Sequence, residues 1–172
     1  MEDALKHIAG LMAISARTAP KAAGQDYVTI RVITGEDVAG LANGMLEYGK
    51  ESGRPNYDRD AGNVRNSPAV LLVGLKDAKA VGLNCGACGN SRCSEIEKVE
   101  GPEFAGEICA WRLVDLGIAL GSAVKTASIL NADNRIMYRI GVVARRMGMM
   151  DADVVAGVPL SATGKSIYFD RK

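Results

Sequence analysis

Histidine is nearly absent from this sequence of 172 residues, and so is any excess of one charge. The only histidine is His7, so one chain cannot build a Ser–His–Asp triad or a multi-histidine metal site. Lys and Arg number 21, and Asp and Glu number 20. A protein that binds nucleic acid or an anionic membrane gathers basic residues on one face, and this balance gives no sign of such an excess. We therefore expect neither nucleic acid nor a membrane among its partners.

Long apolar runs are missing as well. No stretch reaches the roughly 18 apolar residues of a transmembrane helix. The first eight residues carry acids where a secretory signal peptide has a basic start. These observations predict a soluble, cytoplasmic protein. Because the cytoplasmic thiol pool keeps cysteines reduced, structural disulfides are disfavoured.

Hydrophobic periodicity predicts a succession of helices and strands in a single domain, residues 1–172. Helices are expected at residues 2–18, 36–53, 113–130 and 134–147. Strands are expected at residues 27–34, 69–75 and 152–160, with a further short strand at 166–169. Thr34 is expected to cap the second helix, and the continuously apolar Ala69–Leu75 is typical of a central strand buried on both faces. The order predicts an α+β fold, a mixed sheet flanked by helices, with a cysteine-rich insert at about residues 79–109.

All four cysteines of the chain lie in this insert: Cys85, Cys88, Cys93 and Cys109. Three interpretations are open, namely a disulfide pair, a zinc ion and an iron–sulfur cluster. Structural zinc sites usually combine two close pairs of ligands, whereas here only Cys85 and Cys88 form such a pair. A cluster has corners several ångströms apart, so three neighbouring thiols and one distant thiol suit it better. Glycines at 86 and 89 allow backbone N–H groups to turn towards the sulfur atoms.

The segment Cys85–Cys93 resembles the four-cysteine [4Fe–4S] domains of corrinoid iron–sulfur proteins and electron-transport subunits. Their fingerprint is C-G-x-C-G-x-x-x-C followed by a distant cysteine. The residues that match it position by position are Cys85, Gly86, Cys88, Gly89, Cys93 and Cys109. The resemblance implies that each cysteine supplies one thiolate to a [4Fe–4S] cluster, and zinc is the alternative metal.

Acidic residues crowd the end of the insert. Between Ser94 and Cys109 a single lysine, Lys98, accompanies five glutamates: Glu95, Glu97, Glu100, Glu103 and Glu107. Negative charge beside a cluster disfavours its reduction, which predicts a low potential and a redox partner that docks near Glu95–Glu107. The alternative is a solvated rim whose effect on the cluster is weakened by solvent and salt.

Four segments resemble the nitroreductase fold, whose members bind flavin mononucleotide (FMN): Ala16–Asp26, Asn63–Val73, Asp115–Ala127 and Ala156–Leu160. In the first, Ala19, Pro20 and Ala22 match a small-residue loop that touches the flavin. The resemblance implies a nitroreductase-like domain with FMN as a second cofactor. The chain lacks that family's arginine-rich N-terminal segment, which holds the flavin phosphate. The candidate FMN-binding residues are therefore Arg17, Lys21, Gly24, Lys165 and Arg171, and the alternative is that the four cations are ordinary surface charges.

Over nearly all its residues the chain resembles an uncharacterised family described as containing a ferredoxin domain. This resemblance brings little function with it. The cysteine motif and the nitroreductase-like segments together imply a redox protein that relays single electrons through a [4Fe–4S] cluster to FMN or to a docked partner, with a flavin-dependent oxidoreductase as its enzyme form. The alternative is a non-catalytic dimeric module with a structural four-cysteine zinc site. A homodimer is expected in both cases, because the predicted helix 113–130 is apolar and rich in small residues such as Gly117 and Gly121. Asp115 on that helix is expected to be a cap or a hydrogen-bonded buried group.

Overall fold

The centre of the molecule is a four-stranded sheet. The computed structural model describes residues 1–169, and within them the strand order is β1 (Val28–Thr34), β2 (Ala69–Leu75), β6 (Val154–Ser161) and β5 (Asp133–Asn134). All seven residues of the central strand β2 are buried, as its apolar sequence predicts. The α+β class is confirmed, but the mixed sheet is corrected, because each pair of neighbouring strands is antiparallel. The helices after β1 return the chain to the end of the sheet that β1 has reached, so β2 runs back along it.

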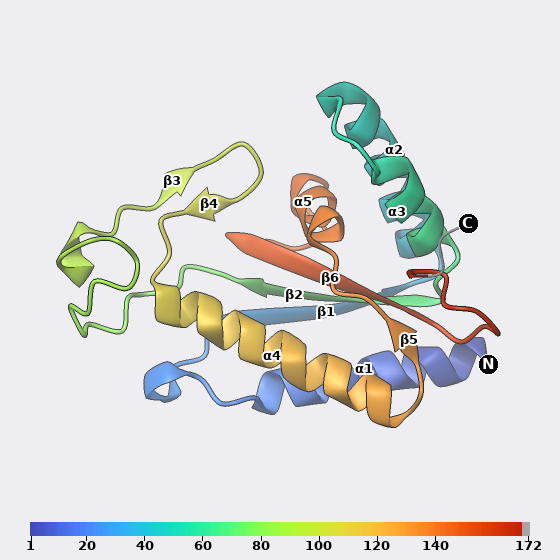
Figure 1. Ribbon diagram of the computed structural model, residues 1–172, viewed down its shortest axis with the longest axis horizontal. Helices are drawn as coiled ribbons and strands as arrows, with labels where there is room; N and C mark the ends of the chain where they lie inside the picture. The colour runs from blue at the N-terminus through green and yellow to red at the C-terminus, as the bar shows by residue number, and fades with distance from the viewer. Residues whose placement is uncertain (170–172) are drawn as a thin grey trace.

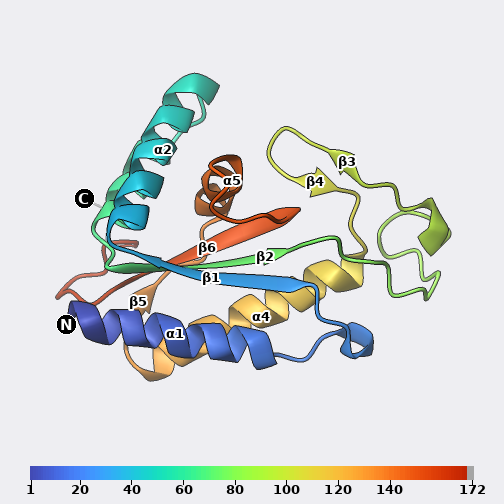
Figure 2. The ribbon, with the colours of Figure 1, turned by 180° about the vertical axis from the view of Figure 1, so that it is seen from behind.

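Two helical layers cover the faces of this sheet (Figures 1 and 2). One layer consists of α1 (Glu2–Thr18) and α4 (Ala110–Ile129), which pack on Leu71 and Val73 of β2. The other consists of α2 (Glu36–Ser52), α3 (Tyr57–Arg65) and α5 (Tyr138–Arg146), which pack on Val70 and Leu72. Successive side chains of a strand point to opposite faces, so β2 supplies both apolar cores.

The last of these helices approaches the sheet very closely. A side chain at Gly141 in α5 would overlap the backbone carbonyl of Val155 in β6. Because Gly141 has no side chain, the backbone of α5 can approach the backbone of β6 at this point.

Several predicted boundaries are corrected. Thr34 is not the cap of α2, because Gly35, with a φ of 56°, occupies that position. The helix predicted from residue 134 begins at Tyr138, because Asp133–Asn134 pair with β6 and Met137 bridges to Gly157. Residues 167–169 form a turn, so the strand predicted at 166–169 is wrong. In residues 1–169 no helix has the length and apolar character needed to cross a membrane.

The chain between β2 and α4 leaves the two layers and projects from one end of the sheet (Figure 1). This segment, residues 76–109, is called the insert below. It contains a 3₁₀ turn (Cys93–Glu95) and a small hairpin of β3 (Val99–Glu100) and β4 (Ala105–Gly106). Val28 at the start of β1 pairs with Leu75, directly before the insert. The loop that precedes β1 therefore lies at the same end of the sheet as the insert.

Candidate metal-binding site in the cysteine-rich insert

The four cysteines differ in their exposure to solvent. Cys85 is exposed, Cys88 and Cys93 are half-buried, and Cys109 is buried. Cys109 is the residue that caps the N-terminus of α4, where its carbonyl accepts the N–H groups of Arg112 and Leu113. The positive end of a helix dipole favours a negatively charged group such as a thiolate. The predicted fourth ligand is thus fixed on the rigid body of the protein, while the other three lie on the projecting loop.

Asn84 closes the loop that carries the first three cysteines. Its backbone N–H donates to the Cys93 Sγ at 3.3 Å, and its side-chain oxygen accepts the Cys93 N–H at 2.9 Å. Between these residues the chain turns at Gly86 and Gly89, with φ values of 73° and 97° that favour glycine. The Gly89 N–H donates to the Gly86 carbonyl. The positive φ values agree with the expected need for glycine at these two turns, but the Gly89 N–H is bonded to a carbonyl and not to a sulfur atom as predicted.

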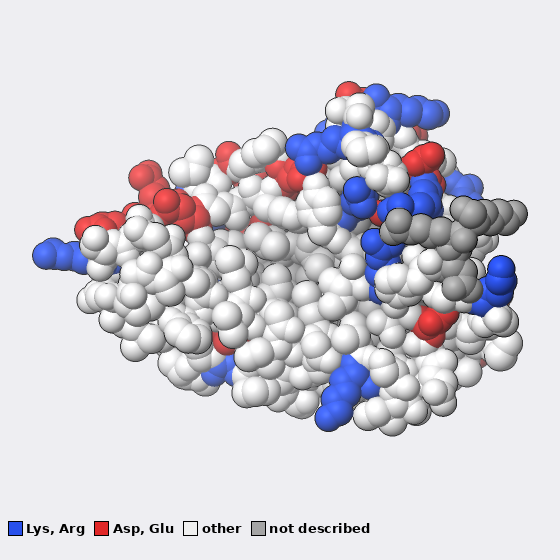
Figure 3. Space-filling view, in the orientation of Figure 1, with Lys and Arg blue, Asp and Glu red and all other residues white. Residues whose placement is uncertain are grey.

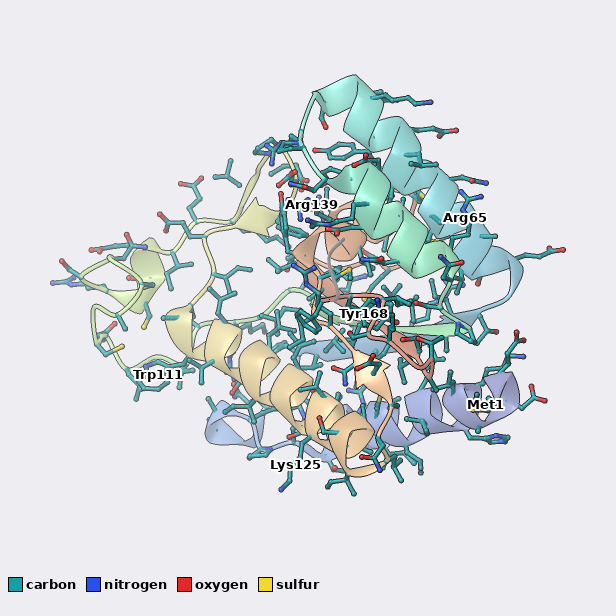
Figure 4. All side chains as sticks on the ribbon, turned by 45° about the vertical axis from the view of Figure 1, so that its right-hand side comes forward. Met1, Arg65, Trp111, Lys125, Arg139 and Tyr168 are labelled. Atoms are coloured by element: carbon teal, nitrogen blue, oxygen red, sulfur yellow. The ribbon has the colours of Figure 1, made fainter. Side chains whose placement is uncertain are left out.

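Trp111, the only tryptophan, links Cys85 to the start of α4. Its indole N–H donates to the Cys85 Sγ at 3.4 Å, and its side chain lies at the base of the projecting loop (Figure 4). The backbone N–H of Ala87 and the indole N–H of Trp111 both stabilise the thiolate and lower the pKa of Cys85. Since Trp111 lies two residues after Cys109, this contact brings the first cysteine towards the fourth. Sequence reasoning missed Trp111. Its position two residues after Cys109, in the first turn of a helix, is the feature that could have indicated an indole near the cysteines.

The chemistry of the donor set fits a soft metal or an iron–sulfur cluster, because four thiols are what such groups prefer. N–H groups directed at two of the sulfur atoms add to this fit. In the part of the chain described here, no three His, Cys, Asp or Glu side chains are close enough together to ligate one ion. Three of the predicted ligands thus lie on the projecting loop, and the fourth, Cys109, lies where the insert joins α4.

The acidic end of the insert is fastened to the body by specific contacts. The Glu103 carboxylate accepts hydrogen bonds from the hydroxyls of Tyr48 and Tyr138 and pairs with Arg54 at 2.8 Å. Glu100 receives a two-pronged hydrogen bond from Arg145. Figure 3 shows acidic residues along the upper edge of the insert. Two of the five glutamates thus act as anchors, and Glu95, Glu97 and Glu107 are exposed.

Beneath the insert lies a fully buried arginine, Arg112, that sequence reasoning also missed. Its guanidinium donates to the backbone carbonyls of Lys79 (2.8 Å) and Ala22 (2.9 Å). It also pairs with Asp115 at 3.1 Å and stacks 4.8 Å from the centre of the Tyr27 ring. Asp115 is buried and hydrogen-bonded, as predicted, and accepts the Ala22 N–H at 2.8 Å. The i, i+3 spacing of Arg112 and Asp115 on one helix is the signal that could have revealed this pair.

The candidate FMN residues fall into two separate groups. Arg17 pairs with Asp26 and Lys21 donates to carbonyls of the last turn of α1, so both cations stabilise the C-terminal end of that helix. Gly24, with a φ of 64°, belongs to the 3₁₀ turn Ala22–Gly24 beside them. Lys165 is exposed in the segment after β6, which lies at the opposite end of the sheet (Figure 1). Arg171 lies outside the described residues.

Comparisons with known proteins address both the cysteine motif and the fold. The family described as "Uncharacterized protein containing a ferredoxin domain (DUF2148)" matches residues 105–171, a range that includes Cys109. An uncharacterized protein of Archaeoglobus fulgidus is 53% identical over 171 residues, covering 98% of this chain and 92% of that protein.

Solved structures of nitroreductases share the fold. The FMN-dependent nitroreductase NfnB of Mycobacterium smegmatis, in complex with NADPH, gives a TM-score of 0.60 at 9% identity and covers 96% of this chain and 82% of its own. A nitroreductase with bound FMN from Desulfitobacterium hafniense gives 0.58 at 14% identity, over 92% and 78% of the two chains. At such identities the likeness shows a nitroreductase-like fold, which confirms the fold predicted from the sequence.

Proposed function

The chain belongs to the family of uncharacterized proteins containing a ferredoxin domain, and from this premise we propose that it is an iron–sulfur redox protein that relays single electrons. The observation that carries the proposal is an insert whose projecting loop carries three cysteines and whose last residue is the fourth, with N–H donors directed at two of the sulfur atoms. A four-thiolate set with N–H donors suits a [4Fe–4S] cluster, which accepts and releases one electron at a time.

Four residues would hold that cluster, each through one thiolate: Cys85, Cys88, Cys93 and Cys109. The chain's own contribution is to fix two members of this set. Cys109 is held by the first turn of α4, and Cys93 is held by both backbone and side chain of Asn84. The indole of Trp111 and the backbone at Asn84 stabilise negative charge on sulfur.

Electrons would enter or leave at the solvent-facing edge of the insert. Cys85 and Trp111 are exposed there, and Glu95, Glu97 and Glu107 leave an acidic rim after Glu100 and Glu103 have paired with arginines. We expect a partner with a basic docking face, since unpaired carboxylates attract such a surface and steer its approach. Its binding should weaken with added salt.

The test is a potentiometric titration of anaerobically purified protein followed by visible absorption. We expect a single one-electron transition, and Cys93→Ser should abolish it, while Ser91→Ala in the same loop should leave it intact. A transition unchanged by Cys93→Ser would contradict the assignment. A colourless protein with one zinc ion per chain, no sulfide and no redox transition would overturn the proposal in favour of the structural module.

A homodimer formed through α4 is a second part of the proposal. The outward face of this helix exposes Leu113, Val114 and Ile118, and the space around Gly117 and Gly121 is open. Much of the surface in this view carries no charge (Figure 3). An apolar face with small residues fits a second copy of the same helix, because backbones can then approach closely. Sedimentation should give a dimer, and Ile118→Glu should give a monomer with unchanged circular dichroism; a wild-type monomer at micromolar concentration would contradict it.

FMN is a second candidate cofactor, favoured by the register that places the Ala22–Gly24 turn at the same end of the sheet as the insert. FMN holds two electrons and can pass them as hydride. Within residues 1–169 the candidate cations are not gathered into one phosphate site, since Arg17 and Lys21 are engaged with α1 and Asp26, and Lys165 is remote. Titration of the protein with FMN, followed by flavin fluorescence, tests this candidate. Saturable quenching that is lost in Gly24→Val would support it, and absence of quenching would remove it.

A further inference from the structure

Arg112 lies where three segments of the chain meet, and all its nitrogen atoms are used there. Nε donates to the carbonyl of Lys79 in the insert, Nη1 to Ala22 and Asp115, and Nη2 to the side chain of Gln25. These partners belong to the insert, to the loop before β1 and to α4. The residue is fully buried, and no surface role for the charge is left.

A buried guanidinium is costly unless its charge and its hydrogen bonds are satisfied. Asp115 supplies the opposite charge and at the same time binds the Ala22 N–H. Ala22 is thus held by both its N–H and its carbonyl, and the guanidinium carbon lies over the ring of Tyr27. The fork of an arginine suits such a junction, because its donors point in fixed directions that a lysine cannot reproduce.

We propose that Arg112, with Asp115 as its counter-charge, is a positioning residue that couples the cysteine-rich insert to the Ala22–Gly24 turn; this inference rests on the proposed function of the insert. Its backbone N–H donates to the carbonyl of Cys109, and its side chain holds Lys79, six residues before Cys85. Arg112 therefore ties both ends of the insert to α4. Through Ala22 and Gln25 it ties the loop before β1 to the same point.

The coupling has a consequence for ligand binding at the thiols. If the fork is lost, the start of the insert and the loop before β1 should loosen together, although neither contains a changed residue. The thiols should then bind a metal more weakly, since residues that orient ligands typically contribute about 10- to 100-fold to metal affinity.

The test compares Arg112→Lys, which keeps the charge but loses the fork, with Arg145→Lys as a matched control. Arg145 also fastens the insert, but through Glu100 of the hairpin. Hydrogen exchange is measured by mass spectrometry on peptides covering residues 22–25, 79–93 and 99–106, and zinc affinity is measured by titration of the reduced, metal-free protein. We expect Arg112→Lys to speed exchange about tenfold in the first two peptides, the effect of one lost charge-assisted hydrogen bond. Arg145→Lys should affect only the third.

Two results would overturn the inference: faster exchange in 79–93 with none in 22–25, or unchanged exchange in both. If Arg112→Lys fails to fold, Gln25→Ala can replace it, because this change removes a single exposed partner of Arg112. Hydrogen exchange should then be faster in residues 22–25 and, to a smaller extent, in residues 79–93. Faster exchange in residues 22–25 alone would contradict the coupling. The exchange measurement does not depend on a cluster, so the coupling can hold even if the chain binds no iron. Zinc affinity that is equal in wild type and Arg112→Lys, with coupled exchange, would limit Arg112 to a structural role and overturn its role at the thiols.

Discussion

The layered body and the insert are held together by different forces. In the body, β2 is buried over its whole length between two apolar cores. In residues 76–108 only Ala105 is buried, and the insert is fastened by Lys98, Glu100 and Glu103 through ion pairs and hydrogen bonds. Apolar burial contributes far more to stability than exposed ion pairs do. The body is therefore a scaffold that can fold without any ligand at the cysteines, whereas the insert depends on its polar anchors.

The largest expected effect lies in the body. Gly141→Ala places a methyl group against the Val155 carbonyl, so α5 has to move away from the sheet. We expect a loss of more than about 4 kcal/mol in the free energy of unfolding, in the range reserved for severe core defects. Urea unfolding followed by circular dichroism measures it. Gly62→Ala in α3, where the space is open, is the control and should change stability by no more than about 1 kcal/mol; equal effects of the two changes would contradict the close approach.

A buried tyrosine makes the stability of the body depend on pH in the alkaline range. Burial raises the pKa of Tyr168 to about 12, although the Ser67 hydroxyl lowers it in part. The folded pKa is above the unfolded value, so the contribution is complete below pH 10 and is lost as the pH rises towards 12. We expect wild type to lose roughly 2 kcal/mol more than Tyr168→Phe between pH 10 and pH 12. Urea unfolding at pH 8, 10 and 11.5 measures this, and parallel losses in both proteins would contradict it.

Within the insert the strongest single anchor is Glu103, whose side chain is only 11% exposed. Glu103→Gln removes the charge that Arg54 and two tyrosine hydroxyls bind. We expect local opening of the β3–β4 hairpin to become easier by about 1 kcal/mol, roughly fivefold, with global stability unchanged. Hydrogen exchange of residues 99–106 reports this opening. Glu97→Gln, at an exposed position, is the matched control, and a fall in global stability would contradict the separation of the two regions.

The smallest effect is expected at Trp111. Trp111→Phe removes the indole N–H from the Cys85 Sγ, so the pKa of Cys85 should rise towards its ordinary value. At pH 8 a smaller fraction of thiolate should make Cys85 react more slowly with a thiol reagent in metal-free protein. Leu113→Ala, which changes a neighbouring exposed side chain, should leave the rate unchanged. A faster reaction in Trp111→Phe would mean that the indole merely shields the sulfur.

The sequence predicted best what depends on short-range pattern. The apolar run Ala69–Leu75 identified the central strand, and hydrophobic periodicity identified α1. Both patterns can be read from the sequence because the buried side of an element carries apolar residues at regular spacing. The cysteine spacing likewise predicts a ligand set from the sequence alone. Helix 134–147 was predicted too long because the pairing of Asp133–Asn134 with β6 is a long-range effect that periodicity does not contain.

Contacts between residues that are far apart in the sequence could not be predicted. Arg112 is buried by partners 33 and 90 residues away, and two of these partners are backbone carbonyls that carry no mark in the sequence. The distance between Lys165 and the Ala22–Gly24 turn follows from the direction of β6 in the sheet. The hydrogen bonds from Lys21 to the end of α1 were easier to predict from the sequence, because a cation just after a helix often binds its last carbonyls.

The most direct test of the account is the iron, sulfide and zinc content of anaerobically purified wild-type protein. We expect about four irons and a similar amount of sulfide per chain, with a brown colour that dithionite bleaches. Both iron and sulfide should disappear in Cys109→Ser while the body remains folded. One zinc ion per chain with neither iron nor sulfide would contradict the central claim and would leave the insert as a structural module.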